Sequence, residues 1–438
     1  MGTEGRDHSG RTRVLKNGPS TPSPGTKTGD QNLGPPRDQK GRDMKKILFY
    51  RWKAYNYLDI RRAFERAGFE VREIKQKLEN YDVAPEFQQF LSDELKKESY
   101  DFVFTVNYFA VIAEVCHDMS IPYVSWTCDN PLISMYHESV FYDTNFIFSF
   151  DRVNCEEFRS LGVKNIWYLP LAANSDRLSN ALWGHEGGWN QGIYGNEVAF
   201  CGSLYERNTY DRIEKKLPDY LRGYFDGIMG VQADLYGSNI LETMLTPDIL
   251  SVLPKYFHLK KSEGSFSDLS LVFSTTVLGF KTAQIQRMKA LLMLAEEGLS
   301  VSIYSNSDTS ELIGVKYKGG LDYWTELPKC YRETKINLNF TIPNIKSGIP
   351  LRVFDIMGSG GFCLTNFQAE MPEYFKDGYD LVMFYSFGDM VEKARYYLSH
   401  DALRETIASR SAQKIKEFHT VEKRTAVILD TLRKIVIK

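Results

Sequence analysis

The sequence predicts an α/β protein made of two consecutive Rossmann-like domains that face each other across a cleft. Short apolar runs alternate with amphipathic stretches of about 10–15 residues, which is the pattern of strand–helix–strand units in a parallel sheet. The alternation occurs twice, and the segment 170–174 separates the two series. The chain has 438 residues, which is enough for two or three domains of about 150 residues each.

The first series indicates a domain over residues 44–172. The strands expected there are short and apolar: 47–50, 69–74, 102–106, 123–126, 146–150 and 166–169. The helices expected between them are 59–67, 85–97 and 109–119. Ligands bind beyond the carboxyl ends of parallel strands, so Arg51, Trp52, Asn107 and the segment 128–131 are positions of interest.

The second series indicates a domain over 173–420, followed by a terminal helix at 421–438 that we expect to pack back toward the first domain. The strands expected here are 198–201, 301–304, 336–340, 361–364 and 381–384. Residues 207–260 read as mostly helical, and further helices are expected at 282–297, 324–333, 352–357, 390–399 and, without a break, 402–436.

Residues 1–43 differ in kind from the rest of the chain. They are rich in glycine, proline, serine, threonine and charge, and they contain no aromatic residue. Such a segment cannot bury enough apolar surface to offset its chain entropy. We expect a disordered tail or a translated upstream leader, with Met44 as the functional start.

Composition argues against several classes of partner. The net charge is -2, so the charge gives no reason to expect nucleic acid or an anionic membrane as a binding partner. No apolar stretch reaches about 18 residues, and no apolar core of a secretory signal is present near the start.

The six cysteines form no CxxC pair, which favours buried thiols in a reducing, cytoplasmic compartment. Aromatic residues make up 13% of the chain, which suits stacking on carbohydrate or nucleobases, although a large aromatic core explains most of them.

The segment 346–361 is the most informative motif. A Gly-Pro loop leads into a short helix, whose free N–H groups and positive dipole end suit a pyrophosphate. Asp355 lies one turn into this helix, where it can accept hydrogen bonds from ribose hydroxyls. An ordinary helix-to-strand connection with a glycine cap is an equal alternative. The candidate donor-binding residues of this motif are Lys346, Ser347, Gly348, Ile349, Arg352 and Asp355.

Two further patterns point to the same kind of ligand. The loop after strand 198–201 contains Gly202, Ser203, Tyr205 and Arg207, whose small residues and positive charge suit a phosphate. A simple turn is the alternative. The strand 336–340 places two amides on one face, and Asn339 is the member nearest the ligand end. An edge strand with a solvated face would explain that pattern equally well.

The predicted catalytic residues are Asp129 and Arg352. Asp129 follows strand 123–126 in the first domain, where a carboxylate can act as general base toward an acceptor hydroxyl. Its alternative role is to cap a helix. Arg352 lies where charge would develop on a leaving diphosphate. The sequence lacks GxxxxGK[ST], HExxH, GxSxG, an intact GxGxxG and Asp-x-Asp, which argues against the enzyme classes that these motifs mark, and we expect no cofactor.

These residues resemble the CgeB-like, spore-maturation-type glycosyltransferases, whose C-terminal half is similar to the glycosyl transferases of group 1. The resemblance covers about residues 44–438. It rests on ILFYRW (47–52), YDFVFTVNYFAVIAEVC (100–116), SWTCDNPL (125–132), FCGSLYERNTYDRI (200–213), SGIPLRVFDIMGSGGFCLTN (347–366), YYLSHDALRETIA (396–408) and EFHTVEKR (417–424).

The resemblance implies a GT-B fold and a hexosyltransferase-type reaction that moves a sugar from a nucleotide-sugar, in particular a UDP-sugar, without a metal. Group 1 enzymes contact the donor through two acidic residues spaced Glu-x7-Glu. Asp355 matches the second of these, and Ser347 stands at the first.

The acceptor implied is a protein, as in protein glycosylation, a cell-surface glycan or a small molecule. A catalytically inactive, GT-B-shaped sugar-nucleotide-binding or spore-surface protein is the alternative. A nucleotide-sugar epimerase is a further one, but it requires a His and acidic set that we do not find in the sequence.

Overall fold

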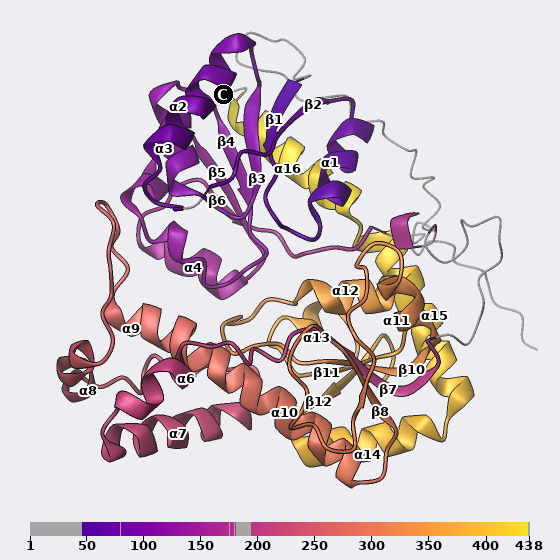
Figure 1. The fold of residues 1–438 in the computed structure, drawn as a ribbon. Helices are drawn as coiled ribbons and strands as arrows, with labels where there is room; N and C mark the ends of the chain where they lie inside the picture. The colour runs from indigo at the N-terminus through magenta and orange to yellow at the C-terminus, as the bar shows by residue number, and fades with distance from the viewer. Residues whose placement is uncertain (1–45, 79, 175, 179, 181–193, 437–438) are drawn as a thin grey trace, which may run out of the picture. The chain divides into compact units, whose positions relative to one another are not determined.

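The computed structural model describes residues 46–436 apart from 79, 175, 179 and 181–193, and these residues belong to one compact unit, 35–438 (Figure 1). The predicted tail 1–43 lies outside the described residues. Two six-stranded parallel sheets confirm the predicted α/β class. No helix of the described residues is long and apolar enough to cross a membrane.

The first sheet has the strand order β2-β1-β3-β4-β5-β6. Its strands are β1 (Lys46–Tyr50), β2 (Glu70–Ile74), β3 (Phe102–Val106), β4 (Tyr123–Trp126), β5 (Asn145–Ser149) and β6 (Ile166–Tyr168). Both faces of this sheet are covered, because alternate residues of one strand enter different buried clusters: Ile47 and Phe49 join one, Leu48 and Tyr50 the other. That is why the sequence shows continuous apolar runs here.

Helices connect these strands and cover the sheet (Figure 1). They are α1 (Tyr57–Arg66), α2 (Pro85–Lys97), α3 (Ala110–Asp118) and α4 (Arg152–Ser160), with single 3₁₀ turns at Ile133–Met135 and Glu138–Phe141. Helix α2 has Pro85 and Glu86 in its first turn and two lysines in its last, which suits both its free N–H groups and its dipole.

The second sheet has the order β12-β11-β10-β7-β8-β9. Its strands are β7 (Asn196–Cys201), β8 (Val301–Tyr304), β9 (Lys316–Tyr317), β10 (Thr334–Asn339), β11 (Cys363–Asn366) and β12 (Val382–Phe384). This order is that of a dinucleotide-type Rossmann sheet, in which the chain reverses direction across the sheet between the first and the fourth strand. Here those strands are β7 and β10.

The helices of this part of the chain flank the second sheet or extend from it (Figure 1). They are α6 (Tyr210–Ile213), α7 (Asp219–Ala233), α8 (Pro247–Val252), α9 (Leu269–Val272), α10 (Phe280–Glu296), α11 (Leu327–Glu333), α12 (Leu351–Gly358), α13 (Met371–Tyr374), α14 (Phe387–Leu398), α15 (Asp401–Phe418) and α16 (Val421–Val436). A π-helical segment, Phe273–Gly279, joins α9 to α10. The side chain of Asn344 packs against Gly279 and donates to the carbonyl of Thr275, and such an insertion widens a helix.

The prediction of one helix over 402–436 is wrong, because the structure has two helices, α15 and α16. The backbone of Ala173 pairs with the chain between them: its N–H donates to His419 O at 3.1 Å, and Val421 N–H donates to Ala173 O at 3.1 Å. These bonds use backbone groups that a continuous helix would need. Helix α16 then packs against α1, and Arg66 pairs with Glu422 at 2.7 Å.

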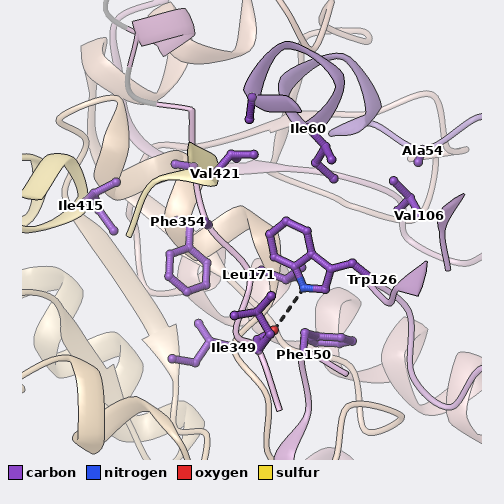
Figure 2. Packing of buried hydrophobic residues seen from close by; sticks show 14 of the residues in the cluster. Ala54, Ile60, Val106, Trp126, Phe150, Leu171, Ile349, Phe354, Ile415 and Val421 are labelled. Atoms are coloured by element: carbon purple, nitrogen blue, oxygen red, sulfur yellow. Dashed lines mark hydrogen bonds between the residues drawn. The ribbon is translucent and has the colours of Figure 1, made fainter. Parts of the chain in front are cut away.

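A single buried cluster contains residues from both sheets and their helices. Figure 2 shows Trp126 and Phe150 from the first part of the chain near Ile349 and Phe354 from the second. The indole N–H of Trp126 donates to Leu169 O at 3.1 Å, which satisfies its one polar group inside this apolar core. The core therefore fixes the loop that precedes α12.

Candidate functional site

Three predicted residues meet where the strand order of the second sheet reverses. Gly202 follows β7, Asn339 ends β10, and Arg352 lies in the first turn of α12. Arg352 Nη1 donates to Asn339 Oδ1 at 3.1 Å, and a Cβ placed on Gly202 would lie 2.6 Å from Arg352 Nη2. Glycine is thus required for the guanidinium to lie over this loop, at the edge where such sheets bind ligands.

Arg287 on α10 supplies a second guanidinium that the sequence analysis missed. It is buried, and it donates to Ser203 O at 2.6 Å and to Phe340 O at 3.1 Å. Its guanidinium lies 4.7 Å from the ring centre of Tyr205. Burial lowers the pKa of Arg287 to about 10, which leaves it cationic at neutral pH. The available signal was a lone arginine on the buried face of the helix predicted at 282–297.

Arg207 lies apart from this cluster. Its side chain is 89% exposed, and its Nε is 3.9 Å from Glu206 Oε1. Tyr205 of the same loop instead turns inward and stacks on Phe280 at 5.2 Å. The loop therefore brings Gly202, Ser203 and Tyr205 to the two inner arginines and leaves Arg207 in solvent.

The loop 346–348 is bound by a carboxylate from the first part of the chain. The backbone N–H groups of Lys346, Ser347 and Gly348 all donate to Asp151 Oδ2, at 2.8, 2.9 and 3.2 Å. The hydroxyl of Ser347 donates to Asp151 Oδ1 at 2.9 Å and to Glu370 Oε1 at 2.6 Å. The amides expected to meet a diphosphate are thus used by Asp151, which also caps α4. The neighbouring Ile349 is buried in the core.

We expect Asp151→Ala to lower the free energy of unfolding by about 3 kcal/mol. Each buried N–H group left without an acceptor costs about 1–3 kcal/mol, and water replaces part of the loss. Urea titration followed by fluorescence measures the change. Asp143→Ala is the control, because Asp143 is 79% exposed and its pair with Lys164 should contribute little. Equal stability of the two variants would contradict a stabilising role for the Asp151 contact.

Asp355 is buried in a charged and aromatic cluster. Tyr323 donates its hydroxyl to Asp355 Oδ2 at 2.9 Å, and Arg177 Nη2 lies 3.5 Å from Oδ1. Arg177 is held in turn by Asp59 of α1, at 3.0 Å. Asp355 Oδ1 has no hydrogen bond within the described part of the chain. Burial raises the pKa of Asp355 to about 6, and the charge of Arg177 opposes the rise.

Asp129 lies in the loop after β4. Solvent reaches its side chain, yet much of the protein surrounds its carboxyl, and this low-dielectric surrounding raises its pKa. Asn107 Nδ2 donates to Asp129 Oδ2 at 2.7 Å, which opposes the rise. The alternative role in helix capping is not seen, because the next helical turn begins at Ile133 and its cap position is Leu132.

A cavity of about 710 Å³ lies at another place, and Lys346 is the one predicted site residue in its lining. Its walls include Tyr136, Glu157 and Phe266, and Lys346 forms an ion pair with Glu157. This cavity contains neither Asp129 nor the arginine cluster, so it carries no part of the chemistry described above. Among the described residues, no group of three or more His, Cys, Asp or Glu side chains could hold a metal.

Part of the second half of the chain matches a known protein family. Residues 286–430 match the family model described as "Glycosyl transferase-like". That segment contains Arg287, Asn339, Arg352 and Asp355. A comparison with curated proteins gives no match.

Solved structures match over nearly the whole chain. Anabaena HepE in complex with UDP and glucose has a TM-score of 0.53 at 11% identity, covering 89% of this chain and 100% of that chain. A UDP-forming α,α-trehalose-phosphate synthase from Burkholderia xenovorans has a TM-score of 0.50 at 11% identity, covering 90% and 98%. The chain has the GT-B fold. At such identities the likeness shows the fold alone.

Proposed function

We propose that this protein is a glycosyltransferase that moves a sugar from a UDP-sugar to an acceptor hydroxyl without a metal ion or other cofactor. The proposal rests on one observation: Arg287 and Arg352 lie beside the loop of Gly202, where the strand order of the second sheet reverses. Both arginines lie in the glycosyl transferase-like segment. The two solved structures named above are described with UDP or as UDP-forming, which supports uridine as the nucleoside of the donor.

The arginines would stabilise the leaving diphosphate. When the bond between the sugar and the diphosphate breaks, negative charge grows on the phosphate oxygens, and fixed cations in a poorly solvated site lower the energy of that state. Arg352 is held by Asn339 and Arg287 by two backbone carbonyls, so neither needs to reorganise during the reaction. These fixed charges would take the place of a metal ion.

The other predicted residues have separate roles in this proposal. Asp355 would accept hydrogen bonds from the ribose through Oδ1, which has no hydrogen bond among the described residues but is buried beside Arg177, so the ribose reaches it only if neighbouring side chains move. Gly202, Ser203 and Tyr205 would line the phosphate end of the donor. Asp129 would remove the proton of the acceptor hydroxyl in an inverting reaction. The loop formed by Lys346, Ser347 and Gly348 would reach the donor only if its hydrogen bonds to Asp151 break.

The finer assignments rest on the sequence resemblance. They are a CgeB-like, hexosyltransferase-type enzyme, and an acceptor that is a protein or a glycan, as in protein glycosylation during spore maturation. A cytoplasmic location rests instead on the six cysteines, which form no CxxC pair. One observation favours the alternative of a catalytically inactive sugar-nucleotide-binding or spore-surface protein. Ser347 stands where group 1 enzymes have an acidic residue, and its hydroxyl is used by Asp151 and Glu370.

A thermal-shift panel of UDP, GDP, CDP, ADP and dTDP, with and without EDTA, tests the donor site. We expect UDP to raise the melting temperature most, and EDTA to leave the shift unchanged. Release of UDP from UDP-glucose then separates an enzyme from an inactive binder. A folded sample that responds to none of the five nucleotides would overturn the proposal.

The affinity for UDP-glucose should fall below about pH 6. Asp355 has a pKa of about 6, so it is ionised above that pH and accepts hydrogen bonds most strongly there. Protonation on acidification weakens this interaction, and Asp355→Asn should weaken binding by about 1–3 kcal/mol and remove the pH dependence. Calorimetric titration from pH 5 to 8 measures both effects. The same acid weakening in wild type and in the Asp355→Asn variant would show that Asp355 does not contact the donor.

A further inference from the structure

The loop that carries Asp129 is fastened by one side-chain amide, that of Asn107. Asn107 follows β3 directly, is buried, and has a backbone φ of 65°, in the left-handed region that asparagine tolerates better than most residues. Its N–H donates to Trp126 O at 2.9 Å, and the hydroxyl of Thr105 donates to its carbonyl oxygen. The backbone of Asn107 is therefore held on both sides.

The side chain of Asn107 uses both of its polar atoms on the Asp129 loop. Its Oδ1 accepts from the N–H of Cys128 at 2.7 Å and from the N–H of Asp129 at 3.3 Å. Its Nδ2 donates to Asp129 Oδ2 at 2.7 Å. The same amide thus fixes the backbone of the loop and one carboxylate oxygen. Asp129 Oδ1 has no hydrogen bond among the described residues, and solvent reaches the side chain.

We propose that Asn107 is the positioning residue of the reaction, which holds Asp129 so that its free Oδ1 receives the proton of the acceptor hydroxyl. This inference rests on the proposed function. In the step it serves, the acceptor oxygen forms a bond to the anomeric carbon. The bond from that carbon to the diphosphate oxygen breaks, its electron pair leaves with UDP, and the acceptor proton moves to Asp129 Oδ1.

The hydrogen bond from Asn107 also favours the ionised form of the Asp129 carboxyl, which is the form that can act as a base. Burial disfavours the ionised form of Asp129, and a donor to its oxygen stabilises that form. The ionisable group facing it is the thiol of Cys128, whose pKa is raised by burial and by Asp129, so that it stays neutral. Within the described residues, no charged side chain from β1, β3, β5 or the second sheet perturbs this carboxyl.

Two substitutions separate positioning from simple support of the loop. Asn107→Asp keeps an oxygen acceptor for both N–H groups but replaces the donor with a like charge. Asn107→Gly keeps the left-handed backbone and removes the amide. Asn165→Asp is the control for an added charge, because Asn165 is half-buried and lies just before β6, at the amino ends of the strands of the same sheet, whereas Asn107 lies at their carboxyl ends.

The readouts are the melting temperature, the pH dependence of UDP release from UDP-glucose with water as acceptor, and a carbon-13 NMR titration of the Asp129 carboxyl, assigned with Asp129→Asn. For Asn107→Asp we expect the acidic limb of the rate profile and the NMR titration to move to higher pH by about 1 pH unit or more, because two carboxyls sharing a site resist double ionisation. Asn107→Gly should move both in the same direction by less. The Asn165→Asp variant should move neither.

A purely structural role of Asn107 predicts a different result. In that case the Asn107 substitutions lower the melting temperature and reduce the rate equally at every pH, and the pH at which Asp129 titrates does not change. An unmoved titration in both Asn107 variants overturns the inference. A moved titration without any UDP release in the wild type upholds the contact with Asp129 but refutes the proposed enzyme, so the two failures are distinguishable.

Discussion

Asp129→Asn is expected to lower the rate of sugar transfer by about 10²–10⁴-fold, which is the usual contribution of a positioned general base. The variant should keep its fold, because asparagine has the same shape and its oxygen can still accept from Asn107. The affinity for UDP should not change, since the donor residues lie at the edge of the other sheet. Initial rates at saturating UDP-glucose, together with a UDP titration, measure the two quantities.

Asp143→Asn is the matched control for Asp129→Asn. Asp143 belongs to the same part of the chain and is 79% exposed, so its loss should leave both rate and affinity unchanged. Unaltered transfer by the Asp129 variant, with UDP binding intact, would exclude an Asp129 base. It would favour a retaining reaction, in which the acceptor proton leaves by another route.

Arg352→Gln is expected to lower the rate of sugar transfer by about 10²–10³-fold, comparable to the loss of one oxyanion-stabilising group in other enzymes. Arg352 lies over Gly202 and Phe200, with its guanidinium 5.1 Å from the ring centre of Phe200. Glutamine removes the positive charge and retains a donor amide for Asn339. The effect should fall mainly on kcat, because the charge on the leaving diphosphate grows only as the bond breaks.

Arg207→Gln is the control for Arg352→Gln. Both arginines were predicted to bind the donor, but the side chain of Arg207 is 89% exposed and lies 3.9 Å from Glu206. We expect less than about a threefold change in kcat/KM for it, equivalent to under about 0.7 kcal/mol. Equal losses in the two variants would mean that the loop 202–207 closes over the donor, and that the arrangement described above is not the reactive one.

The regular elements followed from local patterns. Continuous apolar runs predict strands buried on both faces, and the eleven strands expected from the sequence are found in the two parallel sheets, whereas the short, exposed strand β9 was not predicted. Residues at strand ends share one edge of a parallel sheet, so the sequence places Gly202 and Asn339 at the same edge, and the structure brings them close together because β7 and β10 are neighbours. The unbroken helix predicted over 402–436 failed because a distant backbone segment at Ala173 pairs with the chain at its midpoint.

The sequence by itself determined the fold class and the edge of each sheet where chemistry can occur, because strand period and strand direction are local properties of the chain. Only the tertiary structure decided which polar groups are available there. Asp151 occupies the amides of a loop 196 positions away, and Arg287 reaches the donor loop from the buried face of α10. Both contacts depend on how separate elements pack, and no local pattern of residues encodes that packing.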